Sequence, residues 1–231
     1  MYIMKKQLTE YLSGYVTNER FNLFTNIIEE RTRYLTVVLE DIYQPQNASA
    51  VLRSCDCFGV QDVHIIENRN EFTLNPQVEL GSSKWLTLKK YNEEENNSRL
   101  ALRKLKEQGY RIVATSPHEN DTFLENFDLE KGKTALVFGS ELPGISEVIQ
   151  EEADEFLKIP MYGFTESFNI SVSAAIVLHH LTLNLKKMPK PVWELNEDEK
   201  NELIFEWLKK TIKKSDLIID DYLKKNNSSK S

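Results

Sequence analysis

The sequence predicts an α/β protein built on a parallel sheet, with helices added at both ends of the chain. Short runs of Val, Ile and Leu alternate with amphipathic stretches in which apolar residues recur every three or four positions. Strands that alternate with helices along a chain are typical of a parallel sheet with helical crossovers. We expect an N-terminal helical extension over 1–33, the sheet domain over 34–188 and a C-terminal helical extension over 189–231.

The order of the elements can be followed from the N-terminus. Apolar residues between positions 6 and 31 recur at the helical period and predict one or two helices. Strands are expected at LTVVLE (35–40), DVHII (62–66), RIVAT (111–115), TALVF (134–138) and FLKI (156–159), with helices at about 47–59, 98–108, 146–153 and 169–187. Prolines at 189 and 191 end this domain, and amphipathic helices are expected between 198 and 225.

Composition excludes several classes of protein. The chain has 231 residues, of which 40% are hydrophobic and 28% charged, as in folded soluble proteins. No apolar stretch reaches the roughly 18 residues of a membrane span, and the N-terminus lacks the apolar core of a signal peptide, so a cytoplasmic protein without a membrane partner is expected. Cys55 and Cys57 are too few and too close for a zinc site, and the four histidines lack metal-ligand spacing, so no metal is expected.

The net charge of −7 argues against nucleic-acid binding through bulk positive charge. An RNA partner would have to be held by local basic patches. Paired lysines near the C-terminus could form such a basic face, at 186–187, 209–210, 213–214 and 224–225.

The segment GSELPGIS (139–146) follows a strand and opens a helix, where a phosphate-binding loop would lie. It does not match the Walker A pattern, because Ile145 stands where the phosphate-binding lysine is required. An ordinary strand-to-helix turn explains Gly139 and Gly144 taken alone. Glu141 could complement the helix dipole, or could lie where a ligand approaches the loop.

In IPMYGFTESFNISVSAA (159–175), polar residues gather where a strand runs into a helix. Carboxyl ends of parallel strands are where α/β proteins bind ligands, which favours a site at Ser167 and Asn169. A helix N-cap made by one of these residues is the structural alternative, and both interpretations can hold together.

Asn47 is expected to cap the helix that ends at Gly59, and Arg53 follows among apolar neighbours. A guanidinium is seldom fully buried without a partner. An ion pair with Asp56 or another carboxylate is therefore the simplest interpretation of Arg53 taken alone.

Taken together, three segments resemble the SpoU-TrmH methyltransferases, over about residues 35–180. NASAVLR supplies an asparagine and an arginine at Asn47 and Arg53, and IPMYGFTESFNISVSAA supplies Ser167 and Asn169. LVFGSELPGIS supplies a G-x-E-x-x-G pattern around Glu141. Each segment is weak singly, whereas their order and spacing make the combination specific.

The resemblance implies a SPOUT-type fold: a parallel sheet with helices on both faces, whose C-terminal part is threaded into a trefoil knot. It also implies S-adenosyl-L-methionine as cofactor, in a pocket formed by the knot. The resemblance assigns cofactor binding to Thr115, Gly139, Gly144, Ile159 and Phe168.

The implied reaction is methylation of a ribose 2′-hydroxyl in RNA, with Arg53, Asn47, Glu141, Ser167 and Asn169 in catalytic roles. The family pattern casts the arginine as a general base, but a guanidinium is hard to deprotonate, and stabilisation of the developing oxyanion suits it better. Relatives are homodimers, in which the arginine would come from the partner subunit.

The short terminal extensions resemble the branch of the family that modifies guanosine 18 in the D-loop of tRNA, so tRNA is the expected partner. Methylation of ribosomal RNA or of another tRNA position is the nearest alternative. A non-catalytic RNA-binding protein on the same fold is an alternative of a different class.

Overall fold

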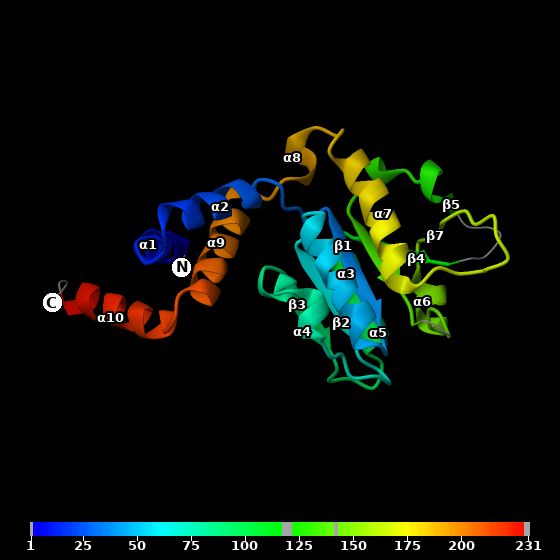
Figure 1. Cartoon of the computed structure of the whole chain (residues 1–231), viewed down its shortest axis with the longest axis horizontal. Helices are drawn as coiled ribbons and strands as arrows, with labels where there is room; N and C mark the ends of the chain where they lie inside the picture. The colour runs from blue at the N-terminus through cyan, green and yellow to red at the C-terminus, as the bar shows by residue number, and fades with distance from the viewer. Residues whose placement is uncertain (1, 117–121, 141–142, 229–231) are drawn as a thin grey trace. The chain divides into compact units, whose positions relative to one another are not determined.

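The fold is described by a computed structural model, which covers residues 2–116, 122–140 and 143–228. The chain divides into two units (Figure 1). The helical unit comprises Met1–Arg31 and Glu194–Ser231, and the sheet unit comprises Thr32–Trp193. Within the described residues, no helix is both long and apolar enough to cross a membrane.

The sheet unit is built on seven strands in the order β3-β2-β1-β6-β4-β7-β5. All of the strand pairs are parallel. The strands are β1 (Leu35–Glu40), β2 (Asp62–Ile66), β3 (Thr87–Tyr91), β4 (Arg111–Thr115), β5 (Thr122–Phe123), β6 (Thr134–Phe138) and β7 (Glu155–Lys158). Because β6 lies between β1 and β4, the carboxyl ends of strands far apart in sequence meet at one edge.

Helices cover both faces of this sheet, which confirms the predicted α/β class (Figure 1). One face carries α3 (Pro45–Cys57) and α7 (Ile170–Leu185), and the other carries α5 (Asn97–Glu107) and α6 (Glu147–Glu152). The shorter elements are α4 (Pro76–Glu79), α8 (Lys190–Trp193) and the 3-10 turns Ser82–Lys84, Leu124–Asn126 and Leu129–Lys131.

Each face of the sheet has its own apolar core, and adjacent residues of β1 contribute to opposite cores. Val37 and Leu39 pack toward α3 and α7, with Leu178 of α7 fully buried among them. Val38 packs toward α5 and α6, against Leu102. All three positions of β1 are buried, as expected for a central strand with both faces covered.

The start of α3 differs from the prediction. Asn47 does not cap this helix, because α3 begins at Pro45 with Gln44 in the N-cap position. Proline suits the first helical position, since its ring fixes φ and its missing N–H needs no partner there. Asn47 therefore lies in the first turn, where its buried side chain can reach other elements.

The helical unit contains α1 (Tyr2–Ser13), α2 (Asn18–Ile28), α9 (Glu197–Thr211) and α10 (Ser215–Ser228). Its core centres on Trp207 of α9, which meets Phe24 of α2 with ring centroids 5.7 Å apart. Lys200 of α9 forms an ion pair with Glu29 at 2.9 Å. The two ends of the chain therefore fold together as one small helical bundle.

Candidate active site

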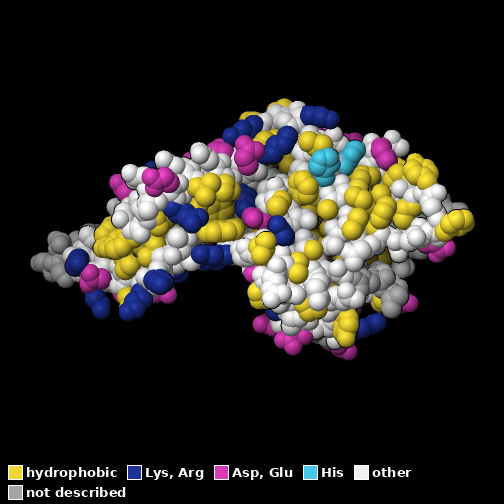
Figure 2. Space-filling model, in the orientation of Figure 1, with side chains coloured by type: hydrophobic (Ala, Val, Ile, Leu, Met, Phe, Trp, Pro, Cys, Tyr) yellow, Lys and Arg dark blue, Asp and Glu magenta, His cyan; other side chains and the backbone are white. Residues whose placement is uncertain are grey.

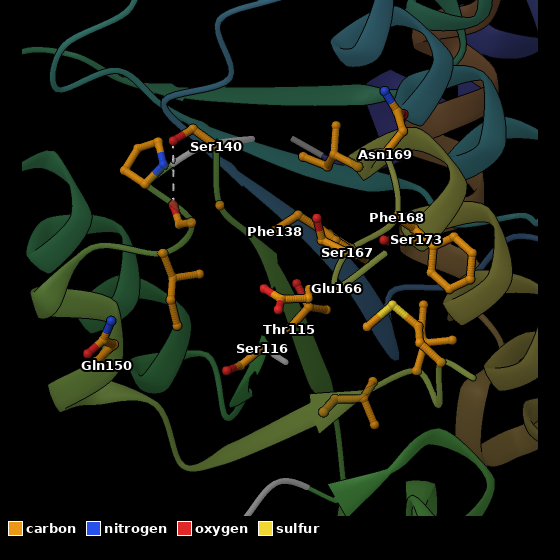
Figure 3. Close-up of a pocket in the computed structure, with 18 of the residues that line it drawn as sticks. Thr115, Ser116, Phe138, Ser140, Gln150, Glu166, Ser167, Phe168, Asn169 and Ser173 are labelled. Carbon is orange, nitrogen blue, oxygen red and sulfur yellow. Dashed lines mark hydrogen bonds between the residues drawn. The ribbon is translucent and has the colours of Figure 1, made fainter. Parts of the chain in front are cut away.

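A cavity of about 640 Å³ lies at the carboxyl ends of β4, β6 and β7 (Figure 3). A volume of this size suits a ligand as large as a nucleoside derivative. The segment between β7 and α7 forms another wall. The lining includes Gln44, Thr115, Ser116, Phe138, Gly139, Ser140, Gly144, Ile145, Gln150, Leu157, Ile159, Met161, Glu166, Ser167, Phe168, Asn169, Ile170 and Ser173.

The loop after β6 is closed by backbone hydrogen bonds between its two ends. The backbones of Ser140 and Gly144 exchange two hydrogen bonds, each of 3.0 Å. A Cβ atom on Gly139 would lie 2.3 Å from the carbonyl carbon of Gly144, so only glycine fits there. Gly144 itself has a φ of 68°, which favours glycine as well. Both glycines are thus required by the turn, and their backbone lines the cavity.

A buried carboxylate anchors the far end of this loop. Glu40, the last residue of β1, accepts hydrogen bonds from the backbone N–H and the hydroxyl of Ser146, at 2.9 and 2.7 Å. It also accepts one from the hydroxyl of Ser98 at the start of α5. Ser146 is the N-cap of α6, so Glu40 fixes the point where the loop becomes a helix.

Polar side chains link the start of α7 to α3. Asn169 caps α7, because its Oδ1 accepts a hydrogen bond from the N–H of Ser171 at 2.8 Å. Its amide nitrogen also donates to Oδ1 of Asn47 at 3.1 Å. The amide of Asn47 donates in turn to Oε1 of Gln44 at 3.2 Å. Asn169 is thus both a cap and part of the cavity wall, as the sequence allowed.

Most of the residues singled out from the sequence lie at this cavity. Those that line it are Thr115, Gly139, Gly144, Ile159, Ser167, Phe168 and Asn169. Asn47 reaches it through the hydrogen bond to Asn169. Glu141 lies outside the described residues.

Arg53 lies away from the cavity. It is exposed on α3 and does not line the cavity wall. Among the described residues it has no hydrogen-bond or ion-pair partner, so the alternative of an ion pair with Asp56 is wrong for this part of the chain. The guanidinium of Arg53 is therefore accessible from solvent.

Sequence reasoning missed several residues of the cavity wall, among them Ser116, Gln150 and Glu166. Ser116 follows the last residue of β4, so the strand-end argument could have found it. Glu166 directly precedes Ser167, inside a segment that was already singled out. Gln150 carries no such signal, because it reaches the cavity from within α6.

The cavity lies where parallel strands end, which is where α/β proteins bind small ligands. The fold and the site therefore define an α/β protein that binds a small ligand. The family follows from comparison with known sequences. Residues 34–179 match the model of the SpoU rRNA Methylase family, and the chain belongs to this family. The resemblance seen in the three sequence segments is thereby confirmed.

Individual relatives match over nearly their whole length. A tRNA (guanosine(18)-2′-O)-methyltransferase of Borreliella burgdorferi is 45% identical over 202 residues, which cover 87% of this chain and 90% of the relative. The protein of the same name from Thermus thermophilus is 32% identical over 199 residues, which cover 84% of this chain and 98% of the relative. The crystal structure of the A. aeolicus TrmH/SpoU tRNA modifying enzyme aligns with a TM-score of 0.74 and 29% identity, over 85% of this chain and 98% of that one.

Proposed function

We propose that this protein methylates the ribose 2′-hydroxyl of guanosine 18 in tRNA. The observation that carries the proposal is the 45% identity to a tRNA (guanosine(18)-2′-O)-methyltransferase over 90% of that relative's length. Such coverage extends beyond the family domain at 34–179 into the terminal extensions. Ribosomal RNA is disfavoured as substrate, because these extensions are shared with enzymes named for tRNA.

S-adenosyl-L-methionine fits the cavity as methyl donor. When bound, it supplies an electrophilic methyl group on a positively charged sulfur, which is neutral once the methyl has left. The wall offers apolar side chains such as Leu157 and Ile159, together with a few polar groups, which is the usual composition of a nucleoside-sized pocket. We assign donor binding to Thr115, Gly139, Gly144, Ile159 and Phe168.

Arg53 is proposed to stabilise the oxygen of the ribose hydroxyl as its proton passes to solvent water and the oxygen gains the methyl group. A protonated guanidinium beside a developing alkoxide lowers the barrier through charge, and arginine does not readily give up its proton. Asn47, Ser167 and Asn169 are proposed to position the ribose and this guanidinium. Glu141 is proposed to shape the same site from the glycine loop.

We infer that Arg53 acts on the cavity of a second copy, in a homodimer. Its exposure, and its absence from the cavity wall of its own chain, support this arrangement. An apolar stripe on α7 supports a dimer interface there: Val172 and Leu183 have 43% and 54% of their surface exposed, and Ile176 lies between them. Figure 2 shows hydrophobic side chains gathered over this part of the sheet unit.

The trefoil knot implied by the family resemblance is also part of this proposal. The chain after β7 and the loop after β6 both line this cavity, which is consistent with a cofactor site formed by a knot. The similarity in fold to the TrmH/SpoU enzyme of A. aeolicus supports it further. A knot is rare enough that general rules of topology would not predict one.

The test is to map the methyl mark on unmodified tRNA incubated with the enzyme and S-adenosyl-L-methionine. We expect one 2′-O-methyl group, at guanosine 18, and none on a tRNA whose guanosine 18 is replaced by its 2′-deoxy form. A mark at another position, or on ribosomal RNA alone, would support the alternative substrates. Tight tRNA binding without any transfer would support the non-catalytic RNA-binding protein instead.

A further inference from the structure

The cavity wall carries a single ionisable side chain among its described residues. That residue is Glu166, and no lysine, arginine or histidine of the described wall accompanies it. Figure 3 labels Glu166 beside Ser167, in the segment that leads from β7 to α7. The electrostatic character of this part of the cavity is therefore negative.

The carboxylate of Glu166 is also not neutralised by any residue that the structure describes. Within the described parts of the chain it makes no hydrogen bond and no ion pair, and its side chain is exposed. Glu40 provides the contrast, because its carboxylate is buried and satisfied by Ser98 and Ser146. An unpaired carboxylate in a ligand cavity favours a ligand that brings positive charge.

We propose that Glu166 is the residue by which the site distinguishes the methyl donor from its demethylated product. This inference rests on the proposed function. The donor carries a positively charged sulfur and the product a neutral one, so a nearby carboxylate stabilises the donor complex selectively. Transfer of the methyl group removes that attraction, and the product is released more easily.

Two other roles for Glu166 predict different results. A contact with the RNA backbone is disfavoured, because phosphate and carboxylate are both negative. A contact with the amino group of the ligand would not discriminate, because donor and product share that group. The ratio of the affinity for the donor to the affinity for the product therefore separates recognition of the charged sulfur from recognition of the amino group that both ligands carry.

The experiment is calorimetric titration of the purified full chain with S-adenosylmethionine and with S-adenosylhomocysteine. Glu166→Gln keeps the size of the side chain and removes its charge. We expect the Kd for the donor to rise about tenfold and the Kd for the product to stay within about twofold. Because Glu166 has no described partner in the fold, the thermal midpoint of the variant should match that of the wild type.

Glu147→Gln is the matched control, since it removes an exposed charge from α6 that does not line the cavity. It should leave both affinities unchanged. An equal loss for donor and product in Glu166→Gln, or no loss for either, would overturn the proposal. A wild-type protein that binds neither ligand would instead overturn the proposed function itself.

Discussion

At the scale of single residues, the unexpected feature of Arg53 is its exposure. Its neighbours Val51 and Leu52 are fully buried and belong to the face of α3 that packs on the core, whereas Arg53 lies on the exposed face of the same helix. The sequence favoured an ion pair within the fold, and the described residues contain none. The role that we propose for Arg53, in the cavity of a second copy, involves a contact outside its own chain, and periodicity within one chain carries no signal for such a contact.

We predict that Arg53→Ala lowers the rate of methyl transfer by about 10²- to 10³-fold, because one preorganised stabilising group of the transition state is lost. Donor affinity and the thermal midpoint should change little, since the side chain neither lines the cavity nor pairs within the described fold. Single-turnover methylation, calorimetry and thermal unfolding on one preparation test this. Arg53→Lys should rescue little, because lysine lacks the planar fork of the guanidinium. Normal turnover by the alanine variant would remove Arg53 from the active site.

His64 provides a second prediction at this scale. The residue is fully buried in β2, and its Nδ1 lies 2.8 Å from the hydroxyl of Tyr91. Burial, helped by the positive charge of Lys89, lowers the pKa of His64 from 6.5 to about 4. The folded protein therefore resists protonation that the unfolded chain accepts.

Between about pH 6.5 and pH 4 the unfolded state binds a proton at His64 that the folded state does not, so stability falls as the pH falls. We expect a loss of about 2 kcal/mol between pH 7 and pH 4.5 from this group. Denaturant unfolding at these two values would measure it, and His64→Gln should reduce the difference. Asp62 does not interfere: burial alone would raise its pKa, but Arg33 and Lys89 outweigh this and lower it, so its contribution is lost only at more acid pH. An equal pH dependence in both proteins would contradict the prediction.

At the scale of elements, the central strands were predictable and the edge strands were not. β1, β2, β4 and β6 match the predicted ranges, because each is an apolar run buried on both faces. β3 was missed because its sequence TLKKY is half exposed and carries two lysines, which breaks the apolar pattern of a buried strand. β5 has only two residues, too few to leave any pattern. Edge strands are defined by their neighbours in space, which the sequence does not specify.

The loop between β6 and α6 depends on an element far away in sequence. We predict that Ser146→Ala lowers the free energy of unfolding by about 1 kcal/mol, through loss of the N-cap and of the bond to Glu40. It should also weaken donor binding, because the end of the glycine loop is no longer fixed. Ser98→Ala is the matched control, since it removes a bond to the same carboxylate from α5 and leaves the loop attached. Equal effects of both variants on donor affinity would show that the anchor does not act through the loop.

At the scale of the whole molecule, the negative net charge does not exclude RNA binding through a local basic face. The net charge is −7, yet Lys213 and Lys214 lie exposed where α9 leads to α10. We predict that the affinity for tRNA falls steeply as the salt concentration rises. Replacing both lysines by glutamine should reduce the slope of the logarithm of the binding constant against the logarithm of the salt concentration. The reduction should be roughly one for each phosphate that these lysines neutralise in the wild type. Filter binding over a range of salt concentrations measures the slope. An unchanged slope would assign the phosphate contacts to another surface.

The dimer proposed from α7 makes a prediction that only the whole assembly can test. If Arg53 serves the cavity of the other copy, a dimer of one Arg53→Ala chain and one Gly139→Val chain contains one intact site. That site combines the cavity of the first chain with the arginine of the second. The other site combines both defects, because a side chain on Gly139 would collide with the backbone of Gly144 and distort the loop.

Each variant alone should be nearly inactive. Unfolding and refolding the two variants together at equal amounts should yield heterodimers for about half of the dimers, with one working site in two, and hence about a quarter of the wild-type rate. Refolding each variant by itself is the control and should restore nothing. If mixing also restores nothing although heterodimers form, Arg53 acts within its own chain. In that case the exposed position of its side chain on α3 would have to change when tRNA binds.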